Sequence, residues 1–115
     1  MTSQFSQLLS SLIRHRGVSG CLVVGDRDGL IVDSHLQIGV DGATVAALGA
    51  SLYRKARRSA AAARFGDAGF FELGAEHGRV FVVGRNGLLV VVVATGQVNV
   101  GLVRVEMLQG LELFG

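Results

Sequence analysis

The chain has 115 residues, of which half are hydrophobic, with 17 glycines and no proline. This composition is typical of one ordered domain over residues 1–115, and it excludes a disordered polar tail or a proline-rich linker. The net charge is only +2, but five of the eleven basic residues lie in a segment without acids between Asp41 and Asp67.

The first half of the chain predicts a helix, a hairpin and a long helix. Residues 3–16 carry apolar side chains at helical spacing, and Gly17 is a typical left-handed helix end. Two β-like runs, 18–25 and 30–36, are joined by a turn that ends in Asp28-Gly29, which favours a tight hairpin. Residues 41–65 are rich in alanine, leucine and arginine and predict the longest helix, with Asp41 as its N-terminal cap.

The second half predicts three strands, over 69–75, 79–85 and 88–95, followed by a helix over 97–113. Hairpin-length links that contain glycine join the strands. The run from Leu88 to Val93 is apolar throughout, as expected for a strand in the middle of a sheet with both faces covered. We therefore expect an α+β fold with one five-stranded antiparallel sheet and the order α-β-β-α-β-β-β-α.

One helix cannot cover a face of such a sheet. Five strands span about 24 Å, whereas one packed helix covers about 10 Å. The short connections favour the first and last helices side by side on one face and the long helix alone on the other. That second face should keep an apolar strip, which usually marks an interaction surface.

Two stripes run along the long helix. One stripe is expected to face the sheet: Val45, Leu48, Leu52, Ala56 and Ala63. The adjoining stripe has small, tyrosine and arginine residues that suit close contact with a second subunit about a two-fold axis: Ala46, Ala50, Tyr53, Arg57, Ala61 and Arg64. The alternative for this second stripe is a solvated helix surface.

Phe70 and Phe71 lie in the first strand after the long helix, which we expect at a sheet edge. Pairing of two such edges would continue the sheet across a dimer. The alternative is that both rings belong to the core, and alternation along a strand requires one of them to do so.

The sequence contains no recognisable catalytic or cofactor site. It has no phosphate-binding loop and no nucleophile elbow, and its three histidines, His15, His35 and His77, lack metal-ligand spacing. The single cysteine, Cys21, lies in an apolar run and is expected to be buried. No segment predicts a membrane span or a secretory signal. We expect a cytoplasmic protein that is not an enzyme and has no cofactor or metal.

The order of elements and several segments resemble the Roadblock (dynein light-chain-like) domain family. The resemblance covers nearly the whole chain and rests on these segments: Gly17–Gly20, Asp26–Val32, the alanine-rich helix after Asp41, Gly87–Val91 and Gly101–Arg104.

The resemblance implies a homodimer, or a pair of related domains, with a continuous sheet and paired long helices. In similar bacterial proteins this platform binds a Ras-like small GTPase and regulates it, as an activator or a scaffold. The basic residues Arg54, Lys55 and Arg58 would then suit an acidic partner surface. Two alternatives stay open: a small-molecule-sensing α/β domain, and a nucleic-acid-binding module that uses the basic helix, although no nucleic acid is expected as a partner.

Overall fold

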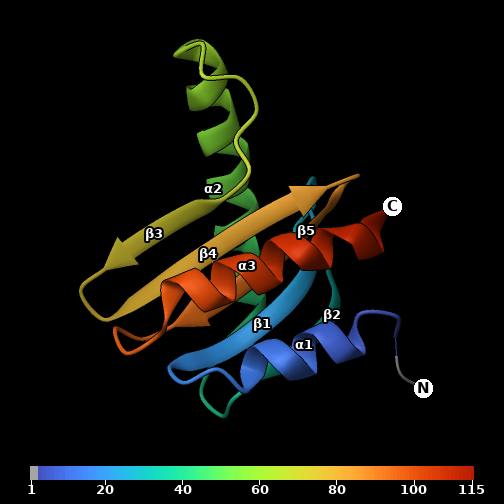
Figure 1. Ribbon diagram of the computed structural model, residues 1–115, viewed down its shortest axis with the longest axis vertical. Coiled ribbons are helices and arrows are strands. Elements are labelled where there is room, and N and C mark those ends of the chain that lie inside the picture. Colours follow the sequence, from blue (N-terminus) through green and yellow to red (C-terminus); the bar gives the residue numbers. More distant parts are fainter. Residues whose placement is uncertain (1–2) are drawn as a thin grey trace.

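The computed structural model describes residues 3–115 (Figure 1). The elements follow the predicted order: α1 (Ser6–Ile13), β1 (Val18–Gly25), β2 (Ile31–Leu36), α2 (Gly42–Ala62), β3 (Phe71–Ala75), β4 (Gly78–Arg85), β5 (Leu88–Ala94), α3 (Val100–Gly110) and a closing 3-10 helix, η1 (Leu111–Phe114).

The five strands form one sheet in the order β2-β1-β5-β4-β3, and every neighbouring pair is antiparallel. The apolar strand β5 lies in the middle, where Val91 pairs with Leu22 of β1 on one side and with Val82 of β4 on the other. The predicted fold class and the central position of this strand are therefore confirmed. β2 and β3 are the two edges of the sheet.

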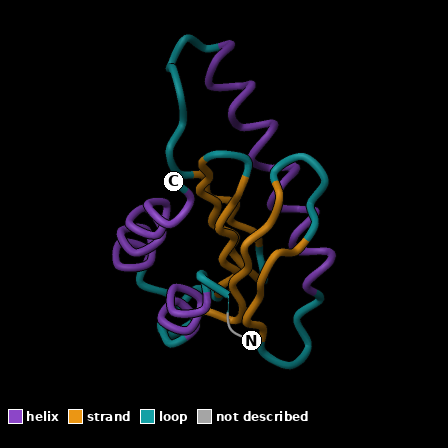
Figure 2. The backbone as a smooth tube through the Cα atoms, turned by 90° about the vertical axis from the view of Figure 1, so that its right-hand side faces the viewer, coloured by secondary structure: helices purple, strands orange, loops and turns teal. Residues whose placement is uncertain are grey.

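Helices cover the two faces of the sheet unequally (Figure 2). α1, α3 and η1 pack on one face around a core that includes Leu12, Phe81 and Met107. α2 packs alone on the other face, where Leu22, Val82 and Val91 are buried beneath it. This is the predicted division of the helices between the faces.

Local signals explain where the elements begin and end. Gly17 has a φ of 86° after α1, and Asn86 and Gly87 both have positive φ in the two-residue turn between β4 and β5. The side chain of Asp41 accepts a hydrogen bond from the backbone N–H of Thr44 at 3.2 Å and so caps α2, as predicted. The ends shift by a few residues elsewhere, and the predicted last helix begins at Val100 and finishes as η1.

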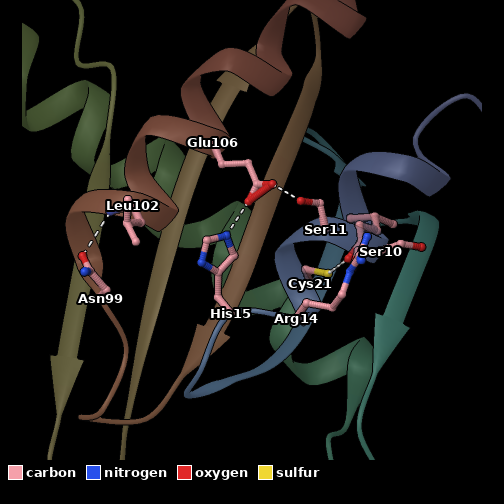
Figure 3. A network of polar contacts seen from close by, with 9 residues as sticks. Ser10, Ser11, Arg14, His15, Cys21, Asn99, Leu102 and Glu106 are labelled. Atoms are coloured by element: carbon pink, nitrogen blue, oxygen red, sulfur yellow. Dashed lines mark hydrogen bonds and ion pairs between the residues drawn. The ribbon is translucent and has the colours of Figure 1, made fainter.

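Polar contacts join α1 to α3 on the two-helix face (Figure 3). The ring of His15 lies 2.6 Å from a carboxylate oxygen of Glu106, and the hydroxyl of Ser11 donates to the other oxygen. Beside them, the buried thiol of Cys21 donates to the carbonyl of Leu9. The contacts of Glu106 hold α3 against α1 and the turn that follows it, and the thiol contact joins α1 to β1.

Candidate partner-binding surface

The centre of the α2 face that packs on the sheet differs from the one predicted. Ala46 is 0%, Ala50 1% and Tyr53 7% exposed, because all three side chains point into the sheet. These residues were predicted to contact a second subunit. That prediction is wrong for their side chains, because they are already buried within a single chain.

Glycines determine which face of α2 meets the sheet. A Cβ placed on Gly49 would lie 2.7 Å from a methyl group of Val91, so the helix backbone approaches the sheet closely at this point. One turn later, the ring of Tyr53 fills the space above Gly84 and meets the ring of Phe71 edge-on at 5.7 Å. Small residues and one inserted ring therefore form the centre of the contact, and the aliphatic residues Val45 and Leu52 pack at its side.

The stripe predicted to face the sheet does so only in part, because Val45 and Leu52 pack against the core beneath α2 while the rest of the stripe lies to one side of the contact. Leu48 is 40% exposed, Val45, Leu52 and Ala56 are half-buried, and Ala63 is exposed beyond the sheet. We call Val45, Leu48, Leu52 and Ala56 the apolar flank. The centre of the sheet face beneath α2, including Leu22, Val82 and Val91, is buried, so the apolar strip predicted to stay uncovered there is not found. The exposed apolar residues on this side include Leu48 of α2 and Leu73 of the edge strand β3.

β3 leaves one edge of the sheet open, as predicted, because no strand follows it in the sheet order. Phe70 stacks on Phe81 on the α1 and α3 side, while Phe71 joins the core beneath α2. Both rings are therefore half-buried on opposite faces of the sheet. Leu73 shares the α2 side with Phe71 by strand alternation and stays exposed.

The C-terminal turns of α2 project beyond the sheet (Figure 1). Arg57 and Ala61 of the predicted interface are exposed in the C-terminal half of α2, and Arg64 is exposed just after the helix ends. Arg64 has a φ of 64°, which lets the N–H of Phe65 reach back to the carbonyl of Ala60 at 2.9 Å and end the helix. The ring of Phe65 is left 82% exposed at the tip.

Two of the basic residues on α2 have partners within the chain. Nη1 of Arg54 donates to the backbone carbonyls of Asp26 and Arg27, at 2.8 and 3.4 Å. The guanidinium of Arg57 lies 5.3 Å from the centre of the Tyr53 ring and 3.5 Å from a carboxylate oxygen of Asp67.

Lys55 and Arg58 are exposed, and neither forms an ion pair or a hydrogen bond with another residue in the described range 3–115. Within α2 itself (Gly42–Ala62) they are the two cations without a partner among the described residues.

A shallow, open hollow of about 700 Å³ lies between the β1–β2 turn and the C-terminal half of α2. Its lining comes from these residues: Asp26, Arg27, Tyr53, Arg54, Arg57, Arg58, Ala61 and Asp67. The sequence shows the arginines of α2 as a cluster, but it does not show that Arg27 on a distant turn joins them.

Within the part of the chain that the structure describes, the titratable groups show no arrangement for nucleophilic catalysis. Ser11 and His15 both bind Glu106 and are not paired with each other. Burial, reinforced by Asp33 and Glu106, raises the pKa of the Cys21 thiol to about 12. Among residues 3–115, no group of three or more histidine, cysteine or acidic side chains is placed to hold a metal ion.

The protein is an α+β domain in which one long helix covers one face of a five-stranded sheet and two short helices cover the other face. The family model for the Roadblock/LC7 domain matches residues 4–94, so the chain belongs to this family. Within the described part of the chain, no helix is long and apolar enough to cross a membrane.

Relatives are found in Methanocaldococcus jannaschii. The chain is 32% identical to the uncharacterized protein MJ1340 of this organism over 106 residues, which cover 92% of each chain. It is 33% identical to the uncharacterized protein MJ0310 of the same organism, over 88% of each chain.

Solved structures share the fold at low sequence identity. A Roadblock/LC7 domain from Streptomyces avermitilis superposes with a TM-score of 0.83 at 21% identity, over 96% of this chain and 93% of that one. The gliding protein MglB from Thermus thermophilus superposes with a TM-score of 0.80 at 15% identity, over 98% of this chain and 90% of that one.

Proposed function

We propose that this chain is a non-enzymatic, dimer-forming interaction module that binds and regulates a Ras-like small GTPase in the cytoplasm. Membership of the Roadblock/LC7 family supports the proposal, since the resemblance carries that expectation. The observation that carries it here is the end of α2, which projects beyond the sheet with free positive charges and lies beside an apolar flank and an open strand edge.

The dimer part of the proposal rests on surfaces that one chain leaves uncovered. Leu48 on the apolar flank and Leu73 on β3 are both exposed on the α2 side of the sheet. Pairing of two β3 edges about a two-fold axis would extend the sheet and bring these leucines against a second copy. Self-association also occurs among the structural neighbours, one of which is described as MglB with a tetrameric arrangement.

The projecting end of α2 supports the same arrangement. Ala61, at the end of α2, and Arg64 and Phe65, just after it, are exposed and contribute nothing to the chain's own core. A large aromatic ring exposed at such a tip is a typical interface anchor. In a two-fold dimer this end would reach across to the second copy.

The proposed binding of a GTPase rests on the positive charge of α2. The segment between Asp41 and Asp67 contains no acid, and Lys55 and Arg58 are exposed without partners among the described residues. A concentrated positive surface speeds association with an acidic partner and selects against basic ones. We infer that these two side chains, together with Arg54, contact the GTPase.

The alternative of a small-molecule sensor with its ligand between helix and sheet has less support. The backbone of α2 approaches Val91 so closely at Gly49 that no room for a ligand exists there, and Tyr53 fills the space above Gly84.

The test is calorimetry with a Ras-like GTPase from the native host, loaded in turn with GDP and with a GTP analogue. We expect the double variant Lys55→Glu with Arg58→Glu to bind at least about tenfold more weakly, because close charge pairs across interfaces contribute more than about 1.5 kcal/mol. The double variant Arg14→Glu with Arg16→Glu makes the same charge change on the α1 side and should bind normally. Equal affinity of all three proteins, or no binding to any nucleotide state, would overturn the GTPase assignment.

A further inference from the structure

The hollow beside α2 concentrates guanidinium groups from two elements. Arg54, Arg57 and Arg58 lie on the same side of α2 because their spacing is i, i+3 and i+4. Arg27 faces them from the β1–β2 turn. Four arginines and two acids line the hollow, which leaves a surplus of positive charge.

The arginines keep unused donors despite their internal contacts. A guanidinium has five N–H donors. Arg54 uses Nη1 on the carbonyls of the turn, and Arg57 uses Nη2 on Asp67. Arg58 has no partner in the part of the chain that the structure describes. The contact of Arg54 with the turn also holds its guanidinium in place before any ligand arrives, which lowers the entropy lost on binding.

Tyr53 adds a further polar group. Its ring is buried, yet its hydroxyl forms no hydrogen bond with any of residues 3–115. No buried side-chain oxygen in that range lacks a partner, so the hydroxyl reaches solvent. Tyr53 is also one of the residues that line the hollow.

The two acids of the hollow set its selectivity. Asp67 lies on the segment after α2, is almost fully exposed, and occupies Arg57 at 3.5 Å. A ligand must displace this weak surface pair, which favours a group with more charge and more acceptor oxygens than a carboxylate. Asp26 adds a second negative charge at the rim.

We propose that this hollow is a binding site for a phosphate monoester, held by Arg27, Arg57 and Arg58 and by the hydroxyl of Tyr53. A phosphate dianion suits several guanidinium groups at once, because they bind its oxygens through paired N–H donors. The site does not depend on the GTPase assignment, since the chain alone contains it. Because Arg58 serves both roles, a bound phosphate competes with the acidic partner proposed above.

The experiment titrates inorganic phosphate into the whole chain at about pH 7.5, where the dianion predominates, and at constant ionic strength, and follows the arginine Nε–Hε and backbone signals by NMR. Saturable shifts are expected at Arg27, Arg54, Arg57 and Arg58. Arg58→Gln should weaken the apparent affinity by roughly three- to tenfold, as expected for loss of a charge-assisted hydrogen bond at an open site. Arg16→Gln, the same change on the opposite face, should leave the affinity unchanged.

Asp67→Asn should change the affinity for phosphate in the opposite direction to Arg58→Gln. It frees Arg57 and removes the competing charge, so phosphate should bind more tightly than to the unmodified chain.

Glycerol 3-phosphate and vesicles containing phosphatidylinositol 4-phosphate distinguish a soluble ester from a lipid headgroup as the source of the phosphate. Shifts that are spread over all arginines, or equal effects of Arg58→Gln and Arg16→Gln, would overturn the proposal.

Discussion

The ring of Tyr53 lies where a side chain of residue 84 would be. A Cβ on Gly84 would lie 2.7 Å from the ring atoms Cε1 and Cζ of Tyr53, well inside contact distance. The same ring meets Phe71 of β3 edge-on, and the guanidinium of Arg57 lies over it at 5.3 Å from its centre. The contact therefore fixes the rotation of α2 on the sheet and, through it, the placement of the hollow and of the apolar flank.

Substitution of Gly84 should loosen this contact. We expect Gly84→Ala to lower the free energy of unfolding by about 1–3 kcal/mol, because the added methyl group displaces Tyr53 or Leu89 in a packed core. Gly74→Ala on β3 is the matched control, since nothing lies within 4 Å of the position that its Cβ would take. Urea unfolding of the two variants measures the difference, and equal stability would show that Tyr53 does not pack on residue 84.

The helix face is the part of the fold that the sequence could not predict. Turn residues such as Asp28-Gly29 and Asn86-Gly87 and the apolar strand β5 are local signals, and they predicted the elements and the sheet correctly. The rotation of α2 instead depends on a contact between residues 53 and 84, which belong to different elements. Periodicity within the helix favours its larger aliphatic side, and it contains no information about a glycine opposite the helix on the sheet.

The position of the sheet beneath α2 also explains why some of the predicted interface residues are exposed and others are buried. Arg57, Ala61 and Arg64 are exposed in the C-terminal half of α2 and just after it, where the helix projects past the sheet, whereas Ala46, Ala50 and Tyr53 are buried because the sheet lies beneath them. One helical stripe thus passes from core to surface along its length. Sequence spacing alone does not show where the sheet ends.

Asp41 should make stability depend on pH in the acid range. Its hydrogen bonds from the backbone and side chain of Thr44 lower its pKa below the ordinary 3.8. The unfolded chain therefore takes up the proton first, and the stabilisation is present above pH 3.8 and lost as the pH falls through the lowered pKa. We expect Asp41→Asn, which retains a capping side chain without a charge, to remove this dependence in urea unfolding from about pH 2 to pH 6. Parallel stability curves for the two proteins would contradict the assignment.

Cys21 should resist thiol reagents in the folded protein. Its side chain is fully buried and its pKa is raised to about 12, so the reactive thiolate is scarce at neutral pH. Labelling with a chromogenic disulfide at about pH 8 is expected to be at least about a thousandfold slower in the native chain than in the urea-unfolded chain. Rapid native labelling would mean that α1 does not cover this thiol.

Leu48 and Leu73 should decide whether two chains associate. Each is an exposed leucine on the α2 side of the sheet, and a lysine at either position would place an unpaired charge in the proposed dimer contact. We expect Leu48→Lys with Leu73→Lys to convert the dimer to a monomer in size-exclusion chromatography with light scattering. Leu102→Lys changes a similarly exposed leucine on α3 and should leave the dimer intact.

Sedimentation velocity of the unmodified chain tests the proposed self-association most directly. We expect a species of twice the 12.0 kDa mass of one chain at low micromolar concentration. A stable monomer across the whole concentration range, with Leu48 and Phe65 left in solvent, would contradict the dimer.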